Sequence, residues 1–277
     1  MIRWGLAIFL WIIPLTAHAN KIQDSDALKL SGSFTQGGLV FGQTLRGASV
    51  ALDGRQIRVS NLGHFVLGFG RDHQVDALLT VGLPGGQKIT RSISVEAREY
   101  KTEKIGGLPP SKVTPSAKFL KRIRKENGKI AEIRSLDTAQ NWYRSGWEWP
   151  AIGRISGVFG SQRILNGIPK RPHYGLDVAA PVGTSVFAST DGIIRMSETD
   201  LYYTGGTVMI DHGYGLVSVY SHLSKLSVNV GDFVKQGMKI GEIGATGRAS
   251  GPHLDWRLNW FKERLDPELL LGPMPKK

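Results

Sequence analysis

The stretch GGTVMIDHGYGLVSVYSHLS, residues 205–224, decides the fold of the second half of the chain. It contains two short apolar runs, Thr207 to Ile210 and Leu216 to Tyr220, and glycines lie beside both runs. Similar runs occur at residues 192–194 and 228–234, and short runs of this kind between turn residues are typical of β-strands. The sequence therefore predicts a β-rich domain over residues 147–277.

The sequence pattern of residues 20–105 predicts a small antiparallel β domain. Asp53-Gly54 lies between two alternating runs, and this dipeptide favours the tight turn of a β-hairpin. Phe65, Leu67 and Phe69 are spaced by two, so they point to one face of a strand. We expect a sandwich-like domain that targets or regulates rather than catalyses.

Residues 106–146 predict a linker followed by a basic amphipathic helix. Thr114-Pro115 is typical of a helix start, with proline at the first helical position. Apolar residues then keep helical spacing from Phe119 to Ile133, whereas lysine and arginine occupy the other face. We expect this helix to pack on a domain surface, with binding to the cell envelope as the alternative.

Composition limits the chemistry and the partners. The chain has 277 residues, of which 41% are hydrophobic and 21% are charged, as in globular proteins. It contains no cysteine, which excludes disulfides, thiolate metal ligands and cysteine nucleophiles. The net charge of +12 favours an anionic partner such as nucleic acid, a membrane surface or an acidic polymer.

The N-terminus favours an envelope location. Arg3 precedes an apolar run from Trp4 to Pro14, and the small residues around Ala17 and Ala19 follow. This order predicts a signal peptide over residues 1–19, cleaved after Ala19. An uncleaved anchor is the alternative, but the run is shorter than the roughly 20 residues that span a bilayer. We expect a periplasmic protein that meets an envelope polymer and no nucleic acid, without a membrane span after cleavage.

Five side chains in the second half carry candidate chemistry: His173, Asp177, His222, His253 and Asp255. Imidazole nitrogen and carboxylate oxygen are zinc ligands, and catalytic zinc sites use three protein ligands and a water. His253 and Asp255 are two residues apart, so in a strand they point to the same face. The alternative is a set of unrelated polar residues in loops.

We interpret His212 as a structural turn residue, and Asp266 and Glu268 as surface charges.

The motifs HYGLD (173–177), YSHLS (220–224) and GPHLDW (251–256) occur in an order that resembles the lysostaphin-type zinc endopeptidases, which cut peptidoglycan cross-bridges. The resemblance covers about residues 149–270. It implies that His173, Asp177 and Asp255 bind Zn²⁺, and that His222 and His253 are catalytic. The family usually has histidine where this chain has Asp255, although aspartate is also a zinc ligand.

The resemblance implies a zinc-dependent metalloendopeptidase that hydrolyses peptide cross-links of peptidoglycan during cell-wall remodelling, with a peptidase domain that has an open groove. Asp255 supports an alternative, a catalytically degenerate protein that binds peptidoglycan or activates another wall hydrolase. An envelope regulatory protein is a further expected partner. A third interpretation treats residues 228–244 as a biotinyl or lipoyl carrier, but Lys239 would then lie in a strand and not at a hairpin tip.

Overall fold

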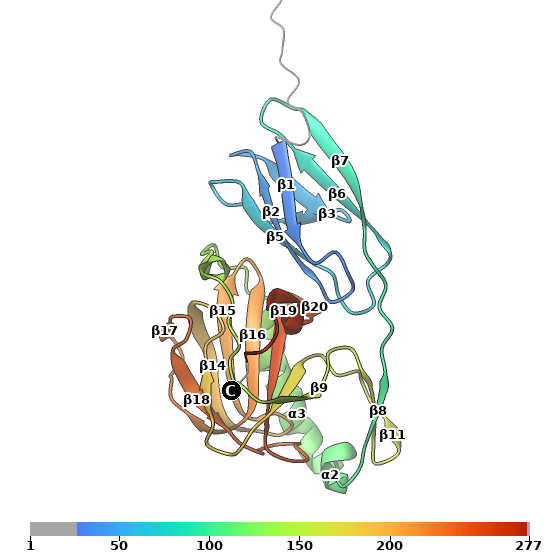
Figure 1. Cartoon of the computed structure of the whole chain (residues 1–277), viewed down its shortest axis with the longest axis vertical. Coiled ribbons are helices and arrows are strands. Elements are labelled where there is room, and N and C mark those ends of the chain that lie inside the picture. Colours follow the sequence, from blue (N-terminus) through green and yellow to red (C-terminus); the bar gives the residue numbers. More distant parts are fainter. Residues whose placement is uncertain (1–26, 276–277) are drawn as a thin grey trace, which may run out of the picture.

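A computed structural model describes residues 27–275 of the chain, so the predicted signal peptide lies outside the described residues. The structure is mainly β, with 44% strand and 12% helix, which confirms the predicted fold class. Within the described part of the chain, no helix is long and apolar enough to cross a membrane. Figure 1 shows a small β unit at one end of the molecule and a larger sheet at the other.

The N-terminal unit consists of two small antiparallel sheets. The first contains β1 (Leu28–Gly32), β2 (Leu39–Thr44) and β5 (His64–Gly68). The second contains β3 (Ser49–Leu52), β4 (Arg55–Ile57), β6 (Asp76–Gly82) and β7 (Lys88–Ser94). The sheets bury one apolar core between them, in which Phe65, Leu67 and Phe69 take part as predicted. The predicted hairpin joins β3 to β4, and Asp53 and Gly54 both have positive φ, 48° and 80°.

The C-terminal unit is built on a ten-stranded sheet with the central order β17-β14-β15-β16-β19-β12-β9. Its strands are β9 (Arg154–Gly157), β12 (Leu176–Ala179), β13 (Ser185–Phe187), β14 (Gly192–Leu201), β15 (Gly205–Gly213), β16 (Leu216–Leu226), β17 (Phe233–Val234), β18 (Lys239–Ile243), β19 (His253–Trp260) and β20 (Glu263–Leu265). Short 3-10 helices η1 (Trp142–Ser145) and η2 (Pro267–Leu270) flank it.

One predicted strand is mostly a turn. Of residues 228–234, only Phe233 and Val234 are extended, as β17. The Asp232 carboxylate accepts a hydrogen bond from the Asn229 backbone N–H at 2.7 Å, and Gly231 has φ +96°. This local side-chain bond closes a turn that competes with strand pairing, so the prediction was wrong there.

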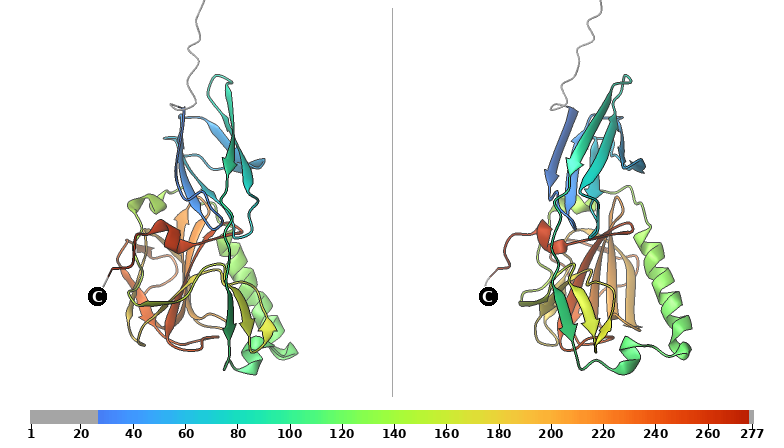
Figure 2. Two further views of the ribbon diagram at one scale, coloured as in Figure 1. Left: turned by 45° about the vertical axis from the view of Figure 1, so that its right-hand side comes forward. Right: turned by 90° about the vertical axis from the view of Figure 1, so that its right-hand side faces the viewer.

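The helical segment differs slightly from its prediction. A short helix α2 (Pro110–Val113) comes first, and the main helix α3 (Ala117–Arg134) begins after Ser116 rather than at Thr114. Ile130 and Ile133 of α3 pack against a cluster that includes Val217 and Val219 of β16. Figure 2 shows α3 lying along one face of the large sheet. The helix therefore packs on the domain surface, the first of the two expected roles.

The two units share one apolar core. Leu216, Leu258 and Trp260 of the large sheet belong to the same buried cluster as Leu39 and Leu67 of the sandwich. The connecting strand β8 (Thr102–Ile105) pairs in parallel with β10 (Gln162–Leu165), which also pairs with β11 (Ile168–Pro169). The first half of the chain thus contributes strand, helix and core to the second.

Asp266 belongs to this junction and is not a surface charge. It is 3% exposed, and its carboxylate accepts a hydrogen bond from the Arg98 guanidinium at 2.8 Å. Its backbone N–H also donates to the Gly37 carbonyl of the sandwich at 2.8 Å. Sequence analysis placed Asp266 wrongly because its arginine partner lies 168 residues away in the chain.

His212 is fully buried in β15. Its Nδ1 lies 2.7 Å from the Asp191 carbonyl, and its Nε2 lies 2.7 Å from the Ser218 hydroxyl. The carbonyl can only accept, so Nδ1 carries the proton and Nε2 accepts from Ser218. Burial lowers the pKa of His212 to about 4, because the charged ring would lose its hydration.

We expect acid to destabilise the protein through His212. The unfolded chain binds a proton at this side chain near pH 6.5, whereas the folded chain does so only near pH 4. The contribution of His212 to the free energy of unfolding is therefore complete above pH 6.5. It falls by about 3 kcal/mol as the pH decreases to 4. Urea unfolding between pH 4 and 8 should show a weaker acid dependence in His212→Gln than in wild type. The control variant Lys88→Gln, an exposed change in β7, should keep the wild-type dependence, and equal slopes in all three proteins would contradict the prediction.

Candidate active site

The candidate site forms where β12 and β19 run side by side. These strands pair antiparallel, and their register places Asp177 directly opposite Asp255. His173 lies in the loop before β12, four residues from Asp177. Ligand atoms of His173, Asp177 and Asp255 all lie within 4.8 Å of one another, and all three residues are buried. The fold therefore brings together the three residues that the sequence proposed as metal ligands.

Two of these residues present free ligand atoms. His173 Nε2 lies 3.1 Å from Asp177 Oδ1, with the imidazole almost completely buried. Neither nitrogen of His173 has a hydrogen-bond partner among the described residues, and neither does Asp177 Oδ1. Buried polar atoms are nearly always satisfied in folded proteins, so these atoms indicate a missing ligand.

His222 and His253 face the same space. Their rings lie 4.7 Å apart between centroids. His222 Nε2 is 4.0 Å from Asp255 Oδ2, and His253 Nε2 is 3.8 Å from Asp177 Oδ1. His222 Nδ1 lies 2.7 Å from the Thr246 carbonyl, and His253 Nδ1 lies 2.8 Å from the Gly251 carbonyl. Since a carbonyl accepts, both Nδ1 atoms carry a proton and both Nε2 atoms point a lone pair into the site when the rings are neutral.

A local distortion of β16 aims His222. Val208 of β15 pairs with Tyr220, but Gly206 pairs with Leu223, so β16 contains one extra residue in between. His222 lies in this bulge with φ +66°, a conformation that non-glycine residues rarely adopt. Bulges redirect single side chains and are frequent beside active sites. Sequence analysis had no signal for this bulge, because the motif YSHLS continues an ordinary strand pattern.

Two arginines neutralise the paired carboxylates. The Arg163 guanidinium donates to Asp177 Oδ2. Arg257 donates hydrogen bonds to both carboxylate oxygens of Asp255. Its Nε lies 2.9 Å from Oδ1 and 3.1 Å from Oδ2, and a terminal guanidinium nitrogen also donates to Oδ2. Gly175 leaves room for this pair, since a Cβ there would lie 2.5 Å from Asp255 Oδ1. Sequence analysis missed both arginines, although Arg257 lies two residues after Asp255 and so on the same strand face.

The arginines keep both carboxylates ionised. Burial acts to raise the pKa of Asp177, but His173 and Arg163 outweigh it and hold the pKa below its usual range. Burial likewise acts to raise the pKa of Asp255, and Arg257, His173 and His222 hold it well below. Burial lowers the pKa of His222 to about 4, against the smaller opposing effect of Asp255. The site thus contains two ionised carboxylates, two compensating arginines and the neutral imidazole of His222.

The residues fit a divalent metal ion, with one restriction. His173 Nε2 and Asp177 Oδ1 are buried, adjacent and unpartnered, as two ligands of an ion would be before it binds. Asp255 is a competent donor by chemistry and distance. Its two oxygens, however, already accept hydrogen bonds from Arg257, so it would have to share them with the ion.

Comparisons with known proteins match this part of the chain. The model of Peptidase family M23 matches residues 171–267, which include all five candidate residues. The peptidoglycan DD-endopeptidase ShyA of Vibrio cholerae is 41% identical over 126 residues, 45% of this chain and 28% of the relative. The DD-carboxypeptidase/endopeptidase Mpg of Neisseria meningitidis is 39% identical over 123 residues, 44% of this chain and 28% of the relative. The chain thus spans less than a third of these relatives' length.

The fold matches a solved structure over most of the chain. A crystal structure of a peptidase M23 candidate from Pseudomonas aeruginosa superposes with a TM-score of 0.64 and 26% identity, covering 86% of this chain and 94% of that one. The ordered motifs, the paired strands and the family match agree on one segment. Residues 171–267 of this chain form a Peptidase family M23 domain of the lysostaphin-like kind.

Proposed function

We propose that this chain is a metal-dependent endopeptidase that hydrolyses peptide cross-links of peptidoglycan. The observation that carries the proposal is the pair of buried, unpartnered ligand atoms, His173 Nε2 and Asp177 Oδ1, facing the lone pairs of two histidines. The family match and relatives named as peptidoglycan endopeptidases support the reaction class and the substrate. Such a substrate favours action in the cell envelope, in agreement with the expected export to the periplasm.

His173, Asp177 and Asp255 would hold the ion, with zinc as the expected metal. When bound, zinc supplies a Lewis acid that polarises a carbonyl and lowers the pKa of a bound water. Asp177 and Asp255 are already ionised in the fold, so no proton has to leave them before they can act as ligands. Arg163 fixes Asp177 through Oδ2 and leaves Oδ1 directed at the site.

His222 and His253 would handle the protons. His222 is neutral at physiological pH because burial lowers its pKa to about 4. The Thr246 carbonyl fixes its Nδ1 as the donor, so Nε2 is the atom that takes a proton from the attacking water. The same tautomer at His253 is fixed by Gly251. A proton taken at either Nε2 can then pass to the leaving nitrogen of the cleaved peptide bond.

A second candidate function follows from one specific observation. Arg257 donates to both oxygens of Asp255 and so supplies internally the positive charge that a metal ion would supply. This arrangement favours a protein that binds peptidoglycan or activates another wall hydrolase without cutting. The N-terminal β unit, which contains no cluster of potential metal ligands among residues 27–105, would target or regulate in either case.

The first test is digestion of purified peptidoglycan by the full chain in the presence of zinc. We expect loss of cross-linked muropeptides by mass spectrometry without release of free glycan chains. His222→Asn should lower the rate by at least about a hundredfold, because the general base is removed. Asparagine is the suitable replacement because it tolerates the positive φ of this position.

The control for this digestion is His64→Asn, which changes a histidine of β5 in the sandwich and should leave the rate unchanged. Unchanged cross-linked muropeptides with wild-type protein and zinc would overturn the enzyme proposal. Retained binding of the protein to sedimented peptidoglycan in that case would favour the second candidate.

The second test measures metal affinity directly. Arg257→Gln frees the oxygens of Asp255 and removes one positive charge beside them. We expect zinc affinity, measured by competition with a chelating dye, to rise by about tenfold or more. Asp255→His combined with Arg257→Gln should bind zinc at least as tightly as Arg257→Gln alone, because imidazole is a strong zinc ligand.

The exposed variant Lys88→Gln, in β7, is the control and should keep the wild-type zinc affinity. Equal affinity in wild type and Arg257→Gln would show that Asp255 is not a ligand. That result would contradict the three-ligand assignment even if the protein hydrolyses peptidoglycan.

A further inference from the structure

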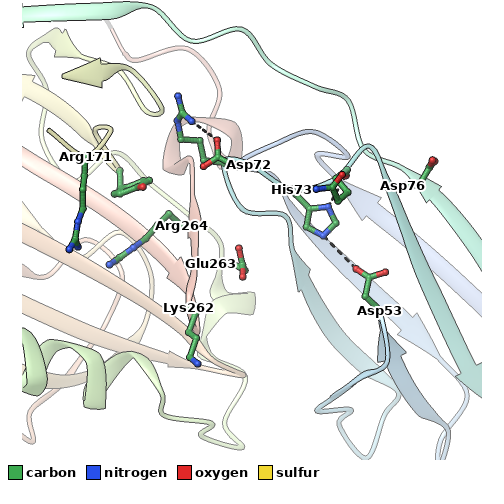
Figure 3. Close-up of a pocket in the computed structure, with 11 residues that line it drawn as sticks. Asp53, Asp72, His73, Asp76, Arg171, Lys262, Glu263 and Arg264 are labelled. Carbon is green, nitrogen blue, oxygen red and sulfur yellow. Dashed lines mark hydrogen bonds and ion pairs between the residues drawn. The ribbon is translucent and has the colours of Figure 1, made fainter. Parts of the chain in front are cut away.

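A cavity of about 800 Å³ lies between the β sandwich and the peptidase domain. Figure 3 shows its two walls, with Asp53 and His73 from the sandwich on one side and Arg171, Lys262 and Arg264 from the peptidase domain on the other. Tyr174 directly follows His173 in the chain and Arg171 lies two residues before it, so the loop that carries this candidate ligand also lines the cavity.

Two carboxylates on the sandwich side of the cavity have partners within the sandwich itself. Asp53 Oδ1 accepts a hydrogen bond from the Leu78 backbone N–H at 2.7 Å, and its Oδ2 lies 3.6 Å from His73 Nε2. Asp72 forms an ion pair with Arg71. These two carboxylates therefore have partners within the sandwich. Asp76 lies on the same wall, and among the described residues no ion pair joins it to the opposite wall.

The opposite wall contains three basic side chains, Arg171, Lys262 and Arg264, and one carboxylate, that of Glu263. Arg264 donates to the side-chain oxygen of Asn259, and its guanidinium lies 5.7 Å from the centre of the Tyr174 ring. Both partners are neutral. Among residues 27–275, Arg171, Lys262 and Arg264 form no ion pair with a carboxylate. Arginines that are shielded from water are normally paired, so the half-buried Arg264 is an uncompensated cation in a partly enclosed place.

The surroundings of Arg264 are themselves positive. Burial, together with the smaller effects of the nearby guanidinium groups of Arg134, Arg257 and Arg171, lowers the pKa of Arg264 to about 9. The side chain remains charged at neutral pH, although the fold disfavours that charge. An anion bound beside it would offset both the burial and the repulsion.

One face of β19 connects this cation to the candidate site. His253, Asp255, Arg257 and Asn259 alternate along the strand and so point to the same side. Arg264 of β20 pairs with Asn259 and shares that face. At about 3.3 Å per residue, Asp255 and Asn259 are roughly 13 Å apart along the strand. An extended peptide of about four residues spans this distance.

We infer that Arg264, with Arg171 and Lys262 beside it, forms an anion subsite that binds a carboxylate of the peptide substrate, about four residues from the bond at His222 and His253. The choice of a peptide rests on the proposed function. The choice of a carboxylate rests on the planar guanidinium, which donates two parallel hydrogen bonds to such a group.

The test measures binding, so it does not depend on hydrolysis. The probe is an N-acetylated tetrapeptide ending in D-alanine with uncharged side chains, prepared once as the free carboxylate and once as the carboxamide. Isothermal titration calorimetry with the full chain should show the carboxylate binding at least about tenfold more tightly. Arg264→Gln should remove this preference, and Arg264→Lys should retain part of it because lysine keeps the charge but not the paired hydrogen bonds.

Two controls separate the subsite from a structural role. Lys88→Gln, an exposed change in the sandwich, should keep the full preference. Arg264→Gln should unfold at the same temperature as wild type or higher, because it removes an uncompensated, half-buried charge while keeping an amide for Asn259.

Equal binding of the two peptides by wild type, or an unchanged preference in Arg264→Gln, would overturn the inference. A preference for the carboxylate in a protein that fails to digest peptidoglycan would support the subsite and overturn only the proposed hydrolysis. Digestion of peptidoglycan by a protein that shows no preference for the carboxylate peptide would support the proposed hydrolysis and overturn the subsite.

Discussion

The site is organised by two buried carboxylates that face each other across one strand pair. Asp177 and Asp255 are direct partners in the register of β12 and β19. Like charges at opposed positions repel, and burial strengthens that repulsion because little water screens it. The two carboxylates therefore need compensating positive charge, and Arg163 and Arg257 supply it in the structure. A divalent ion would supply the same compensation, so metal and arginine act on the same pair of groups.

The two arginines are not equivalent in this competition. Arg163 uses the oxygen of Asp177 that points away from the cluster, and Oδ1 stays free beside His173. Arg257 uses both oxygens of Asp255. An ion can therefore bind His173 and Asp177 without displacing a hydrogen bond, whereas binding to Asp255 requires sharing or release of Arg257. If the three residues bind a metal as proposed, their affinity for it would depend on Arg257, a side chain that is not itself a ligand.

The sequence predicted the parts of this site that short-range patterns determine. The hairpin at Asp53-Gly54 and the mainly β fold follow from turn chemistry and alternation, and the ordered motifs identified the peptidase domain. The opposed register of Asp177 and Asp255 could not be predicted, because pairing between strands 78 residues apart depends on the whole sheet. The bulge at His222 was invisible for a similar reason, since the extra residue is defined only against β15. Asp266 was misplaced because its partner Arg98 lies 168 residues earlier in the chain.

The shared core explains how the first half of the chain can matter for chemistry it does not perform. Trp260 packs into the sandwich core. On the same strand, β19, the polar side chains of His253, Asp255, Arg257 and Asn259 form a row along one face. The same strand therefore anchors the two units to each other and leads from the candidate metal ligands to the cavity between them. Arg264 costs stability there, since a half-buried guanidinium without a carboxylate is unfavourable. It lies in a cavity at the end of that row, where an anionic group bound at the proposed subsite would offset the cost. On that proposal, the packing of the two units also shapes the place where the peptide would bind.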